Sequence, residues 1–542
     1  MKKIGAFLSF LFLSVSLFSF DMILTGDPVL EDLRFLSLKS GRSILSFTPP
    51  FAPAEIRRFL DSIDETTLSQ SAREAYQRVL RRLTPASRIS FVDDNFSVRL
   101  DINSTVEGEA RFNTEISWFP RYQHVTPLIS LPLRGSFMNT AQLYFEPILA
   151  RASHRYGEDT FNTSVLPGFA HGQLNREMSI RAFAAAGGNW WNFQIGRDRL
   201  FWGTGHTGSL IFSDHSPYFD FARLSVFSAN IKYSIIVNQM PLRLSQNIFT
   251  NEWWEAHSNY IDIHRTVLQL YFYLQRLDIR LFNRLSIGIM EGIMVGNSPL
   301  ELRYLNPIIF YHSLWAWNDF PNWGPDNHNG DMVGSFFSLE VNWNIARNLA
   351  IYGQFAMNEF SLPGEEDGHP DAMGWMAGIQ FAHSFNNWGS VSFLEFVYTD
   401  PFLSILSTPY TSFIHMDRAG NYYFIGFPRD TIAVTLGTNF FYRNILNLTG
   451  RFSWIASGEH NNNEETNGLT WDWGRGPEFT ERRTPSGTAE HRFALSFGST
   501  WRPQPWLSLG AGITGIVALN TNHISGNTQI GGQASLSAEF RW

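Results

Sequence analysis

The chain ends in the stretch QASLSAEFRW, residues 533–542, in which apolar and polar side chains alternate. Such alternation predicts a β-strand with one apolar and one polar face. In a soluble protein, an edge strand of this kind with a free aromatic end would promote aggregation, so closure of the sheet into a barrel is favoured. The aromatic final residue, Trp542, also resembles the signal read by the machinery that inserts outer-membrane barrels, which is therefore an expected partner.

The overall composition agrees with a transmembrane barrel. Aromatic residues make up 15% of the chain, with 18 Trp and 48 Phe, yet the mean hydropathy is only -0.14. A barrel combines an apolar outer face and aromatic girdles with a polar interior, so its average hydropathy resembles that of a soluble protein. After the first twenty residues, the sequence contains no apolar run of the roughly 20 residues that a spanning helix needs. The expected membrane contact is therefore between strands and outer-membrane lipid.

The charge and the cysteine content exclude several partners and kinds of site. The formal net charge is -8, which makes nucleic acid an unexpected partner. The chain has no cysteine, which excludes disulfides, thiolate metal sites and a lipid-modified N-terminal cysteine.

Residues 1–19 read as a signal peptide. Lys2 and Lys3 form a short basic start, a mostly apolar stretch follows over residues 4–13, and small residues continue to Ser19. The alternative, an N-terminal anchor helix, would need a longer stretch with fewer serines. We expect cleavage near Ser19 and export of the remainder.

Residues 20–88 are predicted to form a small helical periplasmic domain with three short amphipathic helices. Its start and stop signals are Asp27-Pro28, Gly41, Pro53, the Ser71-x-x-Glu74 capping box and Pro85. These helices are too short to span a bilayer, and their arginine-rich faces suit solvated surface or a docking surface at the mouth of the barrel.

Residues 89–542 are predicted to form the barrel, because segments of about ten residues alternate with period two. Tight turns are predicted near residues 187–188, 228–230, 277, 344–347, 384–387, 443–445 and 502–506. Long connections are predicted near residues 152–176, 199–217, 243–262, 296–330, 360–371, 400–430, 457–490 and 520–528. With two strands between 94 and 119 and one over 137–150, the pattern gives about 18 antiparallel strands, and sixteen is the alternative.

The most distinctive stretch is FQIGRDRLFWGTGHTGSLIFSDHSPYF, residues 193–219. Its marked residues are Gly196, Arg197, Trp202, Gly203 and Gly205. The glycines allow a tightly folded backbone, but no helix pattern follows them to supply a phosphate site.

This stretch resembles the G-R-x-x-x-x-W-G-x-G segment of the Wzi family of capsule-assembly outer-membrane proteins. Two further segments are similar to that family: residues 303–307 (RYLNP), and residues 352–355 (YGQF) with Asn358-Glu359. The resemblance implies a helical periplasmic bundle before an eighteen-stranded barrel. It also implies a non-enzymatic, lectin-like protein that holds exported surface polysaccharide, with outer loops folding into the barrel and closing it.

The predicted outer loops carry tryptophans whose flat faces suit stacking on sugar rings. These candidate polysaccharide-binding residues are Trp253, Trp254, Trp315, Trp317, Trp323, Trp471 and Trp473. The alternative role for each is packing within a loop or a place in an aromatic girdle. The polar run at 325–331 (PDNHNGD) lacks the EF-hand spacing, so no metal site is expected.

Two functions remain open at this point. A polysaccharide-binding barrel would have loops that occlude the lumen, whereas a porin or solute transporter would keep an open lumen. The sequence contains no G-x-S-x-G elbow, H-E-x-x-H motif or phosphate loop, so neither an enzyme nor a cofactor is expected, although a triad assembled in space leaves no sequence pattern.

Overall fold

The structure is a computed structural model of the whole chain. The residues that it describes are 20–84, 89–93, 95–113, 116, 126–151, 161–165, 179–213, 216, 218–242, 268–296, 299–311, 333–359, 372–406, 412–416, 422–459 and 483–542. The predicted signal peptide, residues 1–19, lies outside them.

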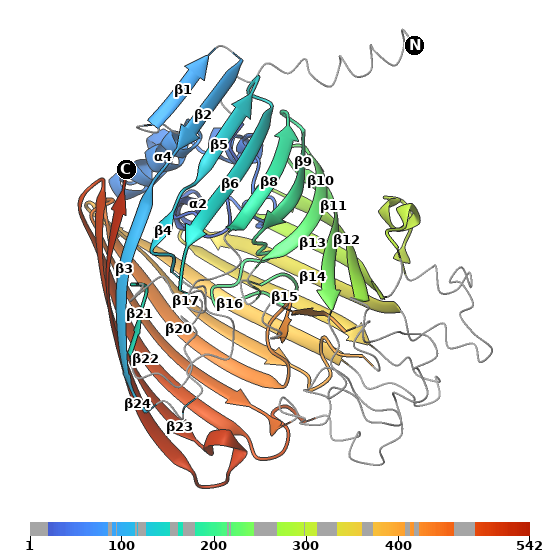
Figure 1. Cartoon of the computed structure of the whole chain (residues 1–542), viewed down its shortest axis with the longest axis vertical. Coiled ribbons are helices and arrows are strands. Elements are labelled where there is room, and N and C mark those ends of the chain that lie inside the picture. The colour runs from blue at the N-terminus through green and yellow to red at the C-terminus, as the bar shows by residue number, and fades with distance from the viewer. Residues whose placement is uncertain are drawn as a thin grey trace.

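The described residues form an antiparallel barrel of eighteen strands (Figure 1). β2 and β3 act as one interrupted strand, β4 and β5 act as another, and β1 and β7 are short additions to this ring. The first strands are β1 (Ile89–Asp93), β2 (Phe96–Leu100), β3 (Asn103–Phe112), β4 (Ile129–Ser130), β5 (Leu133–Phe137), β6 (Ala141–Leu149), β7 (Phe161–Thr163), β8 (Ser179–Gly187), β9 (Trp191–Asp198), β10 (Phe219–Phe227), β11 (Ile231–Leu242) and β12 (Leu268–Leu281). The later strands are β13 (Leu285–Gly296), β14 (Val333–Ala346), β15 (Leu349–Glu359), β16 (Ala372–Phe385), β17 (Trp388–Thr399), β20 (Thr431–Tyr442), β21 (Leu446–Ser457), β22 (Glu490–Gln504), β23 (Leu507–Leu519) and β24 (Thr528–Arg541), with β18 (Ile414–Met416) and β19 (Tyr422–Phe424) forming a separate hairpin.

The last strand closes the ring. β24 pairs with β3 along its length, from Gly532 opposite Phe112 to Arg541 opposite Asn103. At the very end, the Trp542 backbone N–H donates to the carbonyl oxygen of Ile102 at 2.9 Å. The stretch that opened the sequence analysis is thus paired on both edges, which confirms the predicted barrel and disfavours the alternative of sixteen strands.

Six of the seven predicted tight turns lie at chain reversals, and the turn predicted at Leu277 is wrong. Leu277 lies inside β12, and the chain instead reverses at Phe282 and Asn283, which have φ values of 54° and 58°. Positive φ at both central residues is the geometry of a type I′ hairpin turn.

The prediction of two strands between residues 94 and 119 is also wrong. One interrupted strand, β2 with β3, occupies that range, and the second strand of the barrel is β4 with β5. Asp101 and Ile102 interrupt the regular pairing, but the chain continues in the same direction through them.

Three helices precede the barrel, as predicted: α2 (Val29–Ser40), α3 (Pro53–Asp61) and α4 (Gln70–Arg82). A 3₁₀ turn, η1 (Glu65–Thr67), stands between the last two. The Asp27 side chain accepts from the Val29 N–H at 3.1 Å, and Gly41 ends α2 in a left-handed conformation. The third helix starts two residues earlier than predicted, because Ser69 rather than Ser71 is its cap and accepts from the Ala72 N–H. Within the described ranges, none of the helices is long and apolar enough to cross a bilayer.

This helical segment, residues 20–84, closes the end of the barrel that carries the tight turns (Figure 1). The Ser43 N–H donates to the carbonyl of Asn283 in one turn, and the Arg58 guanidinium donates to that of Asn189 in another. Its apolar core continues into the barrel wall at Ala350, Ala382 and Val391. The segment therefore packs into the mouth of the barrel.

Its first residues are also fixed to the wall. Asp21 is 2% exposed and accepts a hydrogen bond from Gln142 at 2.8 Å. Burial alone would raise the pKa of Asp21, but Arg82 and the nearby wall arginines Arg134 and Arg99 outweigh it and hold this pKa below its usual value. The helical segment is therefore joined to the wall by charged as well as apolar contacts.

Candidate functional site: the luminal loops

The connection after β9 turns into the barrel. Leu200, Trp202, Ile211 and Phe212 in this luminal loop, residues 199–213, are completely buried. They pack against inward-facing side chains such as Phe272, whose ring centroid lies 5.6 Å from that of Phe212. A large apolar core of the described chain is thus inside the lumen, and the luminal loop contributes to it.

The glycines of the motif permit this path. Gly203 has a φ of 156°, and its N–H donates to the carbonyl of Phe47 in the helical segment at 3.0 Å. A side chain at Gly205 would lie 2.2 Å from the carbonyl oxygen of Gly208 and 2.7 Å from the sulfur of Met376. A side chain at Gly205 has no room, and one at Gly203 would be strained by the positive φ, so both glycines serve the path of the loop.

Gln354 on β15 holds one part of the luminal loop. Its side-chain oxygen accepts from the Leu210 N–H at 2.6 Å, and its side-chain nitrogen donates to the Trp202 carbonyl at 3.2 Å. One amide group therefore satisfies a backbone donor and a backbone acceptor that the wall strands do not pair.

Glu395 on β17 holds another part. Its carboxylate accepts from the backbone N–H groups of His206 at 2.7 Å and Thr207 at 3.0 Å. It also accepts from the Thr207 hydroxyl and, at 2.7 Å, from the Tyr352 hydroxyl. Four donors on one buried carboxylate fix the loop in a single position.

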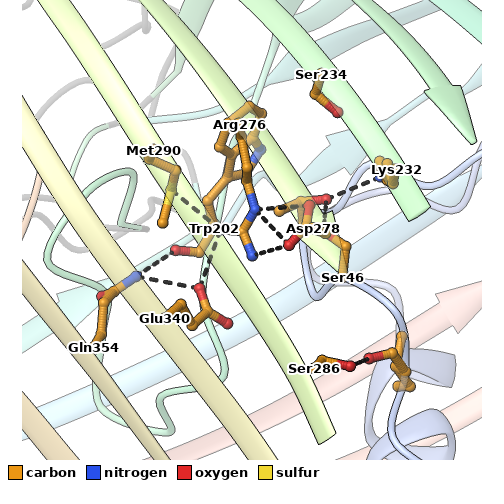
Figure 2. A network of polar contacts seen from close by, with 12 residues as sticks. Ser46, Trp202, Lys232, Ser234, Arg276, Asp278, Ser286, Met290, Glu340 and Gln354 are labelled. Carbon is orange, nitrogen blue, oxygen red and sulfur yellow. Dashed lines mark hydrogen bonds and ion pairs between the residues drawn. The ribbon is translucent and has the colours of Figure 1, made fainter. Parts of the chain in front are cut away.

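A charged network lies beside Trp202 (Figure 2). Arg276 on β12 forms an ion pair with Asp278 at 2.6 Å and with Glu340 on β14 at 3.1 Å. All three side chains are at most 4% exposed. Glu340 also accepts from Gln354 at 3.4 Å, so the network joins the clamp on the luminal loop to the barrel wall.

A second loop, after β17, meets the first one in the lumen. Phe413, Ile425 and Phe427 belong to the same core, and the Ser213 N–H donates to the Ile425 carbonyl at 2.8 Å. Asn358 on β15 holds this second loop, because its amide donates to the Ile405 carbonyl and accepts from the Ser404 N–H.

The helical segment reaches the luminal loop from the other end of the barrel. Arg34 on α2 donates to the carbonyls of Thr204 at 2.6 Å and Gly205 at 3.0 Å. The same guanidinium lies 4.1 Å from the ring centroid of Phe47. The contents of the lumen thus form one continuous packed body.

The first part of the motif has a different position. Gly196 has a φ of 131° at the end of β9, and a side chain there would lie 2.4 Å from the Ala182 carbonyl oxygen. Arg197 points to the outer face, where it makes a two-pronged pair with Asp220 at 2.8 Å and lies 3.8 Å from the Tyr218 ring centroid. These two residues fix the strand end from which the luminal loop departs.

The residues that the sequence singled out form two groups: the motif residues and the predicted sugar-stacking tryptophans. Trp202, Gly203 and Gly205 take part in the packing of the luminal loop, whereas Gly196 and Arg197 fix the strand end before it. Trp202 is too deeply buried to stack on a sugar in this conformation. The seven predicted sugar-stacking tryptophans all lie outside the described residues, as does the run at 325–331. Sequence reasoning missed Arg276, Glu340 and Glu395, although each is a charged residue at an inward position of its strand.

Comparison with known proteins identifies the family. The family model for capsule assembly protein Wzi matches residues 130–405, just over half of the chain. The chain belongs to the Wzi family. It is therefore an outer-membrane β-barrel of a family that is named for capsule assembly rather than for a chemical reaction.

Solved structures agree with this fold. The structure of Wzi from Escherichia coli, described as a carbohydrate-binding β-barrel involved in group 1 capsule assembly, is 14% identical and has a TM-score of 0.58. The match covers 95% of this chain and 98% of that one. The channel DcaP of Acinetobacter baumannii is 9% identical, with a TM-score of 0.35, and the match covers 83% of this chain and 99% of that one. OprD of Pseudomonas aeruginosa is also 9% identical, with a TM-score of 0.40, and the match covers 82% of this chain and 95% of that one. Both are more distant in structure than the Escherichia coli protein. None of the curated proteins matches the chain.

Proposed function

We propose that this barrel binds exported polysaccharide at the bacterial surface and serves as an anchor for it during capsule assembly. The observation that carries the proposal is the packing of the luminal loop around Trp202 in a chain of the Wzi family. A lumen occupied by interlocked apolar side chains suits a rigid scaffold for a binding surface, and it opposes the alternative function of a porin.

The proposal orients the molecule in the membrane. The tight turns and the helical segment face the periplasm, and the long connections face the outside, as in bacterial barrels generally. Residues 1–19 are the removed signal peptide, residues 20–88 the periplasmic domain and residues 89–542 the barrel. The burial of Phe20 and Asp21 against the wall supports a mature chain that begins close to residue 20.

The binding surface that we propose is the outer end, with its tryptophan-rich long connections. The ligand class is a polysaccharide, whose rings stack on flat aromatic faces and whose hydroxyls hydrogen-bond to neighbouring polar groups. The proposed contacts are Trp253, Trp254, Trp315, Trp317, Trp323, Trp471 and Trp473.

Titration calorimetry tests this binding, with polysaccharide extracted from the surface of the source bacterium as the probe. We expect saturable binding by the intact barrel and a loss of about tenfold or more in affinity when Trp253 and Trp254 are both replaced by alanine. The pairs Trp315/Trp317 and Trp471/Trp473 are tested in the same way. The matched control is Trp190→Ala, because this tryptophan is 49% exposed in a tight turn at the opposite end. Absence of binding by the intact protein would contradict the proposal.

Recordings in planar bilayers test the closed lumen separately. The intact barrel is expected to show no steady conductance. Replacing both Gln354 and Glu395 by alanine removes two clamps on the luminal loop and is expected to produce channel openings. A large, steady conductance of the intact protein would instead favour a porin.

A further inference from the structure

The connection after β13 folds in the opposite direction, over the outside of the barrel. Even-numbered residues of β12, such as Phe272 and Arg276, face the lumen, so Tyr273 and Gln275 face outward. Residues 299–311, which we call the outer flap, cover these two side chains: the ring centroid of Tyr304 lies 4.9 Å from that of Tyr273. In Figure 1 the flap is the yellow-green piece beside β12.

Side chains of the wall satisfy the backbone of the flap. Gln275 donates to the carbonyls of Asn306 at 3.0 Å and Ile309 at 3.3 Å. The Tyr273 hydroxyl accepts from the Glu301 N–H at 3.1 Å. Irregular backbone at membrane depth is tolerated only when its polar groups are satisfied by protein, and these contacts meet that condition.

The flap satisfies further groups internally. The Tyr311 hydroxyl donates to the Tyr304 carbonyl at 2.7 Å, and the Ile308 N–H donates to the Asn306 side chain at 3.1 Å. Both tyrosines are 1% exposed, so their polar ends are hidden between flap and wall. The polar side of the flap is therefore turned toward the barrel.

The contacts lie at the depth of the hydrocarbon. Six residues separate Gln275 from Leu281 at the tight-turn end of β12, which corresponds to a height of about 16 Å for a tilted strand. The apolar band of an outer-membrane barrel is about 25 Å tall. The lower part of the flap thus lies within this band, and its beginning lies near the upper edge.

The side of the flap that faces away from the wall is mostly apolar, and Asn306 is its one fully polar exposed side chain within residues 299–311. Leu302 is 78% exposed and Ile308 is 83% exposed. The wall beside the flap is apolar as well, with Ile289 on β13 44% exposed. The charged pair Arg303–Glu301, joined at 2.6 Å, stands at the beginning of the flap, near the level of the lipid headgroups.

We propose that the outer flap is immersed in the membrane leaflet at the long-connection end, where Leu302 and Ile308 contact lipid acyl chains. The polar groups hidden beneath the flap and the apolar surface on top of it together fit lipid better than water. The exposed apolar side of the flap also continues the lipid-facing wall at Ile289, which supports the same placement in lipid. The flap is thus a lipid-binding surface of the barrel, in contrast with the luminal loop.

A single cysteine tests this placement, because the chain has none of its own. The Ile308→Cys variant is labelled with an environment-sensitive fluorophore and reconstituted into phosphatidylcholine vesicles that contain acyl-chain nitroxide lipid. We expect quenching as strong as for the same label in Ile289→Cys on the wall. A label in Ile524→Cys, which is 59% exposed in the connection between β23 and β24, is expected to be quenched little.

Two results would overturn the proposal. Quenching of the Ile308 label by aqueous iodide, at the level of the Ile524 label, would place the flap in water. Protection from both quenchers, with cross-linking to a second copy of the chain, would make the flap a protein interface. Leu302→Cys provides a second reading if the label at 308 disturbs the flap, and migration of unheated samples in gels confirms that each variant is folded.

Discussion

The luminal loop and the outer flap both follow a barrel strand and both contain a segment that resembles the Wzi family, yet they fold to opposite sides of the wall. The luminal loop is held by the charged groups Glu395 and Arg34 and by the amide of Gln354, which the Arg276 network contacts through Glu340. The flap is held by neutral side chains of the wall, Tyr273 at its beginning and Gln275 over its lower part. Because an unpaired charge costs much more in hydrocarbon than a hydroxyl or an amide, the chemistry of each clamp matches the surroundings of its side of the barrel.

Strand β12 contacts a different loop region on each of its two faces. Arg276 and Gln275 are adjacent in β12, and alternation points one into the lumen and the other toward lipid. A single strand therefore supports a loop on each face. Exchange of the two residue types would place a charge on the lipid face and remove the partner of Asp278.

The largest predicted effect comes from breaking the luminal side with Arg276→Met. The change leaves Asp278 and Glu340 buried without their cation, so we expect a loss of about 3–5 kcal/mol in the free energy of unfolding. Urea titration of the folded barrel in detergent micelles, followed by tryptophan fluorescence, measures it. The control is Arg541→Met, which breaks an exposed pair with Glu539 and should cost about 0–1 kcal/mol. Equal losses for the two variants would contradict the assigned role.

A smaller effect is expected for Glu395→Gln. The amide has nearly the same shape, but it presents an N–H₂ group to donors that the carboxylate now accepts from, so the loss should be about 1.5–3 kcal/mol. The same titration measures it, and limited proteolysis should cut the luminal loop faster. Glu539→Gln, at an exposed position, is the control. Unchanged proteolysis with unchanged stability would show that the carboxylate does not hold the loop.

The smallest effect is expected on the outer side, for Gln275→Leu. This change removes the donor to Asn306 and Ile309 but adds apolar surface, and hydrogen bonds in membrane proteins contribute only about 0.6–1.7 kcal/mol. Unfolding measurements should detect a loss in that range. Ile289→Leu, an exposed position on the same wall, is the control and should be close to neutral. A loss in the free energy of unfolding as large as that for Arg276→Met would contradict the expected difference between the luminal and the outer contacts.

The sequence alone predicted the barrel because period-two alternation is a local property of each strand. It misplaced a turn at Leu277 because Arg276 and Asp278 interrupt the apolar pattern there, although both simply face the lumen. It could not show that the chain folds inward after β9 and outward after β13. Those directions depend on partners far away in the chain, such as Gln354 for Leu210.

For the candidate site, the sequence identified the segments that resemble the family but not the structural role of each segment. Gly203, Trp202 and Gln354 lie in segments that resemble the family, and they turn out to pack one loop against the wall. The signal for Glu395 was present as a charge on the inward face of β17, and Arg276 shares the inward face of β12 with Asp278 and Arg280. Without the pairing register, that signal could not be separated from a turn or a solvated edge.

The seam between β24 and β3 has a consequence for the order of events during biogenesis. Every other adjacent pair in the later barrel is a hairpin whose partners follow one another in the chain, whereas the seam joins Ile102 to Trp542. Hairpins form from short-range encounters, but the seam can form only after the hairpins between its two strands have formed. The ring is therefore completed in one late step, and until then the growing sheet has two open ends for its assembly factors to protect.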